Sequence, residues 1–267
     1  MIVFPNAKIN IGLNIVEKRE DGFHNIETIF YPIKINDALE VIESEQTQFF
    51  SEGKQIPGNV EDNICLKAYH LLKHDFKLPP VHIHLLKNIP IGAGLGGGSS
   101  DGAYLIKLLN SKFNLQLCSE KMESYARKLG SDCAFFIENN PVFAVGKGDQ
   151  FIDLELDLSK YFLVLVKPSI HVSTADAYGG CKPHKPLYSL QMLVRNPVSE
   201  WKNLIVNDFE DSVFTKYPEI KILKESLYES GALYVSMSGS GSSVYAFFSH
   251  QVNLPLIEAN HQVFYNV

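Results

Sequence analysis

The sequence predicts a fold that mixes β-strands and α-helices in two lobes. Short apolar runs with strand character alternate along the chain with longer segments of helical spacing. A glycine loop at residues 92–98 separates a strand from a helix. The composition shifts at residues 156–160, just before the apolar run YFLVLV. We therefore expect an N-terminal lobe over residues 1–157 and a C-terminal lobe over residues 158–267.

The composition is that of an ordinary globular protein, with 267 residues of which 45% are hydrophobic and 20% charged. A net charge of −6 argues against a broad nucleic-acid surface. The four cysteines have no metal or redox spacing, and no run resembles a signal peptide or a membrane span. We expect a cytoplasmic monomer or homodimer with reduced thiols and with neither a membrane nor a nucleic-acid partner.

The first predicted strand has apolar residues at alternate positions from Ile9 to Ile15, which indicates one buried face. Lys8 and Asn10 lie on its other face. A solvated outer face is the commoner place for such side chains. Asparagine is a poor strand former, however, so two asparagines on this face, Asn10 and Asn14, indicate a functional role as the alternative.

Phe23 and His24 follow a polar turn at Asp21-Gly22. An aromatic ring and a histidine after a turn can stack on a planar ligand and hydrogen-bond to it, but a core phenylalanine with an exposed histidine is an equally good interpretation. Later in the chain, His82 and His84 share one face of a strand without a third metal ligand, so we interpret them as ordinary strand residues.

The other elements are predicted from periodicity and from capping residues. We expect Ser99, Ser100 or Asp101 to cap the helix after the glycine loop, and Ser119 to cap the next one. Strands are expected over residues 26–33, 38–42, 81–86, 142–145, 150–154, 161–166, 233–237 and 244–248, and helices over 61–76, 99–109, 120–129, 187–193, 200–206 and 219–229.

The glycine loop is the strongest functional signal. Between Gly92 and Gly98 only Ala93 and Leu95 are not glycine, a density that requires positive φ angles or the close approach of a ligand. A glycine loop that leads into a helix presents free N–H groups beside the positive end of the helix dipole, and this arrangement favours phosphate. A flexible linker is the alternative, but Pro90 and the apolar helix argue against it.

Three common nucleotide-binding motifs do not fit this loop. Residues 92–97 match G-x-G-x-x-G, yet the region where a dinucleotide fold needs a second strand and an acidic residue reads as helix. A P-loop needs lysine before its hydroxyl residue, whereas Gly98 precedes Ser99. The H-R-D and D-F-G triplets of protein kinases are absent.

Two further segments have alternative interpretations. Asp132 stands between Gly130 and an apolar run, where it is either a helix cap or a carboxylate placed for general-base catalysis. The Gly/Ser segment 238–243 lies between two predicted strands, and is either a hairpin turn or a second turn that lines a phosphate site.

Six segments together resemble the GHMP kinases, a family of small-molecule kinases, and they occur in the family's order over nearly the whole length. They are Ala7-Lys8-Ile9-Asn10, Asp21-Gly22-Phe23-His24, Gly94 to Ser100, Gly130-Ser131-Asp132, Asn207-Asp208-Phe209-Glu210 and Ser238-Gly239-Ser240-Gly241. The resemblance implies an α+β fold with an N-terminal lobe like ribosomal protein S5 and a ferredoxin-like C-terminal lobe. It also implies ATP and Mg²⁺ as cofactors.

The resemblance further implies roles for single residues. Asp132 matches the catalytic base and Lys8 its partner, with Asn10 beside the acceptor alcohol. The triple glycine and the segment at Phe23-His24 resemble the branch of the family that acts on a cytidine-diphosphate alcohol. His24 matches the residue that reads cytosine, and Phe23 and Tyr178 match aromatic residues that stack on it. Two residues depart from the family pattern, because Phe23 replaces the usual tyrosine and Ser131 the usual alanine.

ATP is expected to contact the glycine loop, residues on either side of it in sequence, and Asn63. The expected contacts are Asn63, Lys87, Pro90, Gly92, Gly94, Leu95, Gly96, Gly97, Gly98, Ser99 and Ser100, with Gly239, Ser240 and Gly241 as a second phosphate-lining turn. Ser100 is also the expected ligand of Mg²⁺, although Ser99 is an alternative. The alternative functions are a sibling kinase for another small alcohol, an inactive nucleotide-binding regulator and a dinucleotide-dependent oxidoreductase.

Overall fold

The computed structural model describes every residue from Met1 to Val267. The chain forms two compact units, each assembled from separate segments of sequence. Unit 1 contains residues 1–7, 34–91 and 96–140, and unit 2 contains residues 8–33, 92–95 and 141–267. Residue 157 lies within unit 2, so these units differ from the single division expected after that residue. The division into two lobes stays a prediction.

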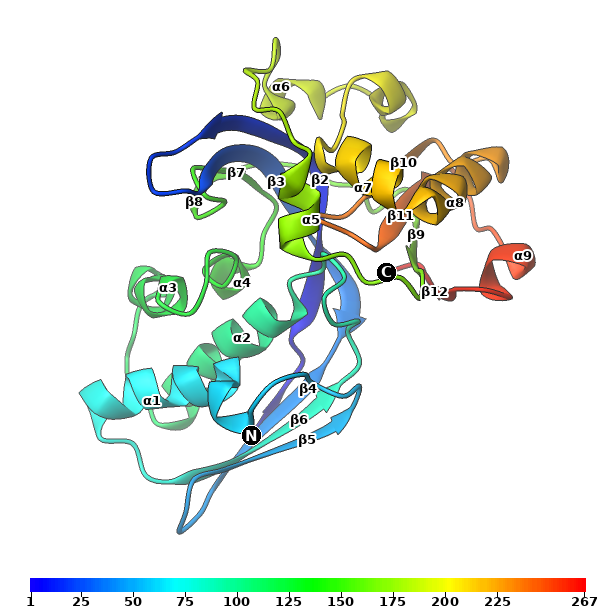
Figure 1. The fold of residues 1–267 in the computed structure, drawn as a ribbon. Coiled ribbons are helices and arrows are strands. Elements are labelled where there is room, and N and C mark those ends of the chain that lie inside the picture. Colours follow the sequence, from blue (N-terminus) through cyan, green and yellow to red (C-terminus); the bar gives the residue numbers. More distant parts are fainter. The chain divides into compact units, whose positions relative to one another are not determined.

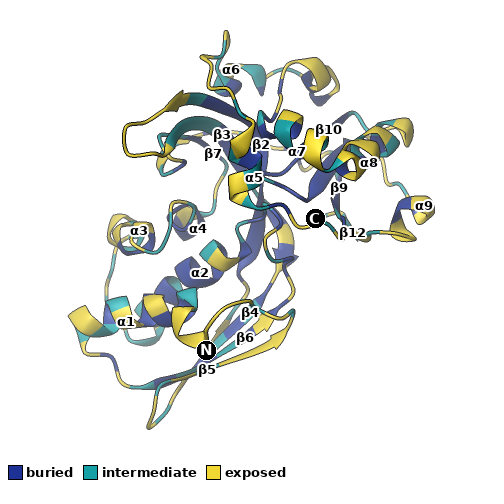
Figure 2. Cartoon of the chain, viewed as in Figure 1, coloured by how far each residue is buried: buried dark blue, intermediate teal, exposed yellow.

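Unit 1 is built on a four-stranded sheet. Its strand order is β1 (Ile2–Val3), β4 (Ala38–Glu43), β6 (Val81–Lys87) and β5 (Gln48–Gly53). β5 runs parallel to β6, and the other neighbours are antiparallel. The helices of this unit cover one face of the sheet, and alternate residues of β6 remain partly exposed on the other (Figures 1 and 2).

Two expected helix caps in unit 1 are wrong. The unit's helices are α1 (Ile64–Phe76), α2 (Gly97–Lys112), α3 (Ser119–Arg127) and α4 (Phe135–Glu138). The N-cap of α2 is Gly96 and not Ser99, Ser100 or Asp101, because the loop turns into the helix with a positive φ of 66° that favours glycine. Ser119 is the first residue of α3 and makes no side-chain cap.

The first sheet of unit 2 shows that one strand is more deeply buried than its sequence predicts. The strand order is β2 (Asn6–Lys18), β3 (His24–Asn36), β7 (Val142–Val145) and β8 (Gln150–Asp153). Residues 6–7 at the start of β2 and residues 34–36 at the end of β3 belong to unit 1. Every residue of β2 from Asn6 to Ile15 is buried, so the expectation of a single buried face is wrong. Its polar side chains therefore need partners inside the protein.

The second sheet of unit 2 is antiparallel throughout. Its order is β10 (Tyr234–Met237), β11 (Val244–Phe248), β9 (Phe162–Lys167) and β12 (Gln262–Tyr265). Leu13 and Ile15 of β2 share one hydrophobic core with this sheet and with α7 (Phe209–Lys216) and α8 (Pro218–Glu229). β2 is thus a structural part of both layers of the unit.

The helices of unit 2 confirm some predictions and correct others. The helix expected over 219–229 is α8. The helix expected over 187–193 shrinks to α6 (Leu190–Leu193), and residues 200–206 do not form an α-helix, since a 3₁₀ turn spans Val198–Asn203 after Pro197. α7 was not predicted. The two remaining helices are α5 (Thr174–Gly179) and α9 (Pro255–Glu258). None of the helices has both the length and the apolar composition needed to cross a membrane.

Candidate active site

The glycine loop has the backbone conformation that its composition predicts. Gly92, Gly94 and Gly96 have positive φ angles of 60°, 76° and 66°. The next two glycines form the start of α2. Residues 92–95, the first half of the loop, belong to unit 2, and residues 96–98, its second half, belong to unit 1. The boundary between the two units falls at the peptide bond between Leu95 and Gly96.

The first half of the loop contacts the second Gly/Ser turn within unit 2. The hydroxyl of Ser238 donates to the carbonyl of Gly94 at 2.8 Å, and the N–H of Ser243 donates to the carbonyl of Ala93 at 3.3 Å. A Cβ atom at Gly94 would collide with the carbonyl of Ser238. Only glycine therefore allows this approach of two backbones. The tip of the turn, residues 239–241, connects β10 to β11 as a hairpin.

Lys8 and Asn10 lie side by side on β2, and each is only 3% exposed. The Nζ atom of Lys8 donates to Oδ1 of Asn10 at 2.5 Å and lies 4.5 Å from the centre of the Phe30 ring. The amide of Asn10 in turn donates to the hydroxyl of Thr28 at 3.0 Å. The backbone N–H of Lys8 donates to the carbonyl of Leu95, which attaches β2 to the loop. A buried cation is thus held in a fixed position beside the first half of the glycine loop.

The second half of the loop forms the N-terminus of α2 in unit 1. The N–H of Ser100 donates to the carbonyl of Gly96 at 2.9 Å, and the three preceding N–H groups have no acceptor within the helix. The hydroxyl of Ser100 is buried and has no hydrogen-bond partner. Free amides at a helix N-terminus suit phosphate, and a hydroxyl oxygen suits Mg²⁺, so these residues fit a nucleotide and its metal.

Asp132 lies in a turn before α4, also in unit 1. Its neighbour Cys133 is buried, and the thiol makes a hydrogen bond with Ser99 at the start of α2. Burial raises the pKa of Cys133 to about 12, so the thiol stays protonated. The Ser131 hydroxyl lies 3.4 Å from Oδ1 of Asp132, a long contact for a hydrogen bond. Asp132 therefore directly precedes a residue that contacts the N-terminal turn of α2.

Lys87 is buried, and its ammonium group contacts two acidic side chains. Its Nζ atom lies 2.5 Å from Asp37 and 2.7 Å from Asp101. Burial raises the pKa of Asp101 to about 8, although Lys87 opposes the shift. Asn63 caps α1 through its side chain, and Pro90 is buried. The ATP contacts expected of Asn63, Lys87 and Pro90 stay predictions.

Two of the three residues expected to bind a nucleobase are in contact in unit 2. The rings of His24 and Tyr178 stack with their centres 4.7 Å apart and their planes at 20°. Phe209 packs edge-on against Tyr178 at 4.8 Å. Burial lowers the pKa of His24, so the ring is neutral near pH 7. Phe23 is 59% exposed, and its ring lies beneath the ammonium group of Lys147.

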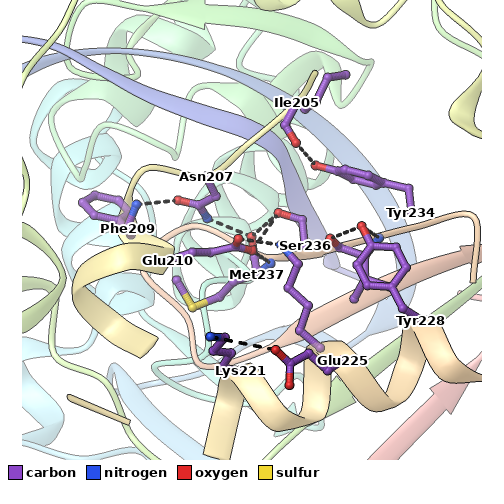
Figure 3. A network of polar contacts seen from close by, with 12 residues as sticks. Ile205, Asn207, Phe209, Glu210, Lys221, Glu225, Tyr228, Tyr234, Ser236 and Met237 are labelled. Atoms are coloured by element: carbon purple, nitrogen blue, oxygen red, sulfur yellow. Dashed lines mark hydrogen bonds and ion pairs between the residues drawn. The ribbon is translucent and has the colours of Figure 1, made fainter. Parts of the chain in front are cut away.

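Two polar residues that hold parts of the site in place, Thr28 and Asn207, were not predicted from the sequence. Thr28 accepts from Asn10 and donates to the carbonyl of Gly12. Asn207 donates to the carbonyl of Met237 at 2.8 Å (Figure 3) and to that of Gly239 at 2.8 Å. A threonine in an apolar strand gives no signal of its role. Asn207 opens one of the segments that resemble the family, and this was the available signal.

Two family models and several curated relatives match this chain. Residues 63–140 match the model of the GHMP kinases N-terminal domain, and residues 190–266 match the GHMP kinases C-terminal model. A Bacteroides fragilis protein named 4-diphosphocytidyl-2-C-methyl-D-erythritol kinase is 58% identical over 253 residues, which cover 93% of this chain and 92% of the relative. A Bacteroides thetaiotaomicron protein of the same name is 52% identical, with 99% and 98% covered.

Solved structures agree as well. A crystal structure of 4-(cytidine 5′-diphospho)-2C-methyl-D-erythritol kinase matches with a TM-score of 0.84 at 27% identity, covering 99% of this chain and 98% of that one. The mevalonate kinase of Methanococcus jannaschii matches with a TM-score of 0.71 at 13% identity, covering 99% and 97%, which shows the fold alone. The expected α+β fold is confirmed. The chain belongs to the GHMP kinase family.

Proposed function

We propose that this protein is an ATP-dependent kinase that phosphorylates the 2-hydroxyl of 4-diphosphocytidyl-2-C-methyl-D-erythritol, a step of the non-mevalonate pathway to isoprenoid precursors. The observation that carries this assignment is the high identity, over nearly the full length, to relatives that bear this name. Membership of the GHMP kinases implies the use of ATP. The stacked rings of His24 and Tyr178 support a substrate with a planar base.

The glycine loop and α2 are the proposed site of the ATP phosphates. Phosphoryl transfer depends on positioning and on the stabilisation of charge, and backbone N–H groups at a helix terminus provide both. Ser100 is the proposed ligand of Mg²⁺, since its buried hydroxyl has no partner in the protein. When bound, the metal neutralises charge on the phosphates. The turn at Gly239, Ser240 and Gly241 supports the first half of the loop.

The proposed chemistry at the acceptor alcohol uses three residues. Asp132 accepts the proton of the attacking hydroxyl. Lys8 provides a fixed positive charge for the transferred phosphoryl group, because its burial and its contact with Asn10 restrict its movement. Asn10 holds that ammonium group in place. Cytosine is read by His24, whose neutral ring can both donate and accept a hydrogen bond.

The test is the release of ADP from ATP in the presence of candidate alcohols. We expect the purified protein to phosphorylate the cytidine-diphosphate alcohol with a kcat/KM at least ~10²-fold above its values for mevalonate, homoserine and galactose. A higher value for one of those three alcohols would assign a sibling kinase instead. Binding of ATP with no ADP release from any alcohol would leave an inactive regulator.

The remaining expectations have no direct test in the structure. A cytoplasmic location, a monomeric or dimeric state and the role of Phe23 in stacking stay predictions. An oxidoreductase is a poor alternative for a GHMP kinase, and a fluorescence titration with NAD(P) is expected to show no binding.

A further inference from the structure

The segment Asn207-Asp208-Phe209-Glu210 has no role in the proposed chemistry. It belongs to unit 2, as Lys8, Asn10 and His24 do. It connects the end of an irregular stretch to α7 and makes a parallel β-bridge with Leu13 of β2. Its side chains contact β2 through Asp208, α5 through Phe209, and β10 through Asn207 and Glu210. The segment therefore links elements that are far apart in the sequence.

Asn207 uses its whole amide group on backbone atoms. Its Nδ2 atom donates to the carbonyl of Met237 at 2.8 Å, and its Oδ1 atom accepts from the N–H of Phe209 at 3.0 Å (Figure 3). The Nδ2 atom also donates to the carbonyl of Gly239 at 2.8 Å. The side chain is 3% exposed. Two donated bonds to carbonyls on either side of Ser238 fix the entry into the Gly/Ser turn. A buried amide with all these bonds satisfied holds one geometry.

Ser238 passes this geometry on to the proposed site. Its hydroxyl accepts from the N–H of Asn10 at 3.2 Å and donates to the carbonyl of Gly94 at 2.8 Å. The residue is fully buried. The position of Ser238 thus determines where β2 presents Asn10 and where the first half of the glycine loop runs. The hydrogen bonds of the Asn207 side chain itself go to Met237, Gly239 and Phe209.

The other three residues of the segment support the same region. The carboxylate of Asp208 accepts from the N–H of Ile15 in β2 at 2.7 Å, and Phe209 packs on Tyr178. Glu210 accepts from the N–H of Met237 at 2.8 Å and pairs with Lys224. Of the four, only Asn207 hydrogen-bonds to the residues on both sides of Ser238, which are Met237 and Gly239.

We propose that Asn207 is a positioning residue for phosphoryl transfer, which fixes the Ser238–Gly241 turn and through it both Asn10 and the first half of the glycine loop. This inference rests on the proposed function for its kinetic consequence. Its structural part, the coupling of Asn207 to β2 and to the loop, is independent of the substrate.

The kinetic test replaces Asn207 with aspartate, which has the same shape. The change turns the donor into an oxygen that faces two carbonyls, while the other oxygen still accepts from Phe209. We expect kcat to fall roughly 10- to 100-fold, because small displacements of reacting groups have effects of this size. The matched control is Tyr228→Phe, which removes the two hydrogen bonds between the Tyr228 hydroxyl and Val235 in the same strand, away from the turn.

The control distinguishes positioning from stability. Asn207→Asp loses two hydrogen bonds to Met237 and Gly239, and Tyr228→Phe loses two to Val235. We therefore expect both variants to have a lower Tm. Only Asn207→Asp is expected to lower kcat, and Tyr228→Phe is expected to retain it within about 2-fold. A loss of kcat that follows Tm equally in both variants would show that Asn207 is merely structural and would overturn the proposal.

The pH profile gives a second signature. A carboxyl group buried among carbonyl acceptors prefers the protonated form, which donates one hydrogen bond to the turn. The ratio of the kcat of Asn207→Asp to that of the wild type is therefore expected to rise as the pH falls from 8 to 6. The Asn207→Ala variant, which has no titratable group, is expected to show a constant ratio. If the aspartate variant does not fold, the alanine variant serves for the kcat and exchange measurements.

Amide hydrogen exchange tests the coupling without any substrate. The N–H groups of Lys8, Asn10 and Ser243 donate to atoms of the loop or the turn. We expect faster exchange at these three in Asn207→Asp than in Tyr228→Phe. Unchanged exchange would overturn the proposal even if kcat falls. A wild-type protein that phosphorylates none of the alcohols would instead refute the proposed function, and the exchange result would still decide this inference.

Discussion

At the level of single residues, Asp132 is a partly exposed carboxylate in a turn next to the buried Cys133. Replacing Asp132 with asparagine keeps the shape but removes the group that can take a proton. We expect kcat to fall by roughly 10²–10⁴-fold, the usual contribution of a general base. ATP affinity, measured by calorimetry with a non-hydrolysable analogue, is expected to change less than about 3-fold.

Ser131→Ala is the control for this variant. It restores the residue usual in the family and removes a hydroxyl that only makes a long contact with Asp132. We expect its kcat to remain within about 2-fold of the wild type. An Asp132→Asn protein with full activity would exclude Asp132 as the base.

Asp101 leads to a prediction about pH and stability. Burial raises its pKa to about 8, far above the value of about 4 in an unfolded chain. The folded protein therefore keeps a proton that the unfolded chain releases, and this contribution to stability is lost as the pH rises towards 8. The Asp101→Asn variant cannot lose that proton.

We expect the free energy of unfolding of Asp101→Asn, relative to that of the wild type, to rise between pH 5 and pH 8. The slope has an upper limit of about 1.4 kcal/mol per pH unit for a single group. Urea unfolding of both proteins at several pH values measures it. A difference that does not depend on pH would show that Asp101 is ionised in the folded protein over this range.

Single residues also show how far the sequence could predict the site. Their spacing predicted that Lys8 and Asn10 share one strand face, the family resemblance assigned them to the site, and their contact is observed. Their burial was not predicted, because alternation reports one covered face and gives no information about a second layer. The pairing of Lys87 with Asp37 was also out of reach, since 50 residues separate the two.

At the level of elements, the glycine loop shows two separate reasons for glycine. Gly94 has a positive φ of 76°, and a Cβ atom there would collide with the carbonyl of Ser238. For comparison, Gly231 lies outside the loop, after the end of α8, and has a positive φ of 93° with open space where a Cβ atom would be. We expect Gly94→Ala to raise the KM for ATP at least ~10-fold, because the loop must move away from the turn.

Gly231→Ala is the matched control for the loop variant. It carries the cost of the left-handed backbone, about 1–2 kcal/mol of stability, without the collision. We expect a lower Tm and an unchanged KM for ATP. A KM for ATP that stays at the wild-type value in Gly94→Ala would show that the first half of the loop does not contact the nucleotide.

Elements with a clear apolar pattern were predicted well, and those without one were missed. β9 and β11 are mostly continuous apolar runs, and they lie where expected. β5 was missed because its residues are mostly exposed and show no alternation in polarity. α7 was missed because it starts within a polar segment whose side chains hold neighbouring elements instead of capping the helix.

At the level of the whole molecule, neither unit is formed by one continuous stretch of sequence. Unit 2 takes β2 from the start of the chain and its second sheet from the end. Leu13 and Ile15 belong to its core. Val206 and Asp208 bond to the backbone of β2 at these two residues. A composition shift locates a change along the chain, and it contains no information about a strand that is supplied from 150 residues upstream.

A fragment of residues 158–267 is therefore expected not to fold alone. It lacks Leu13 and Ile15, whose burial contributes about 3–6 kcal/mol together, and this is a large share of the 5–15 kcal/mol that typically stabilises a domain. It also leaves the backbone groups that bond to β2 without partners. Circular dichroism during thermal unfolding is expected to show no cooperative transition for this fragment, whereas co-expression with residues 1–157 restores one. Cooperative unfolding of the isolated fragment near the Tm of the full chain would instead establish residues 158–267 as an independent lobe, as the composition shift alone predicts.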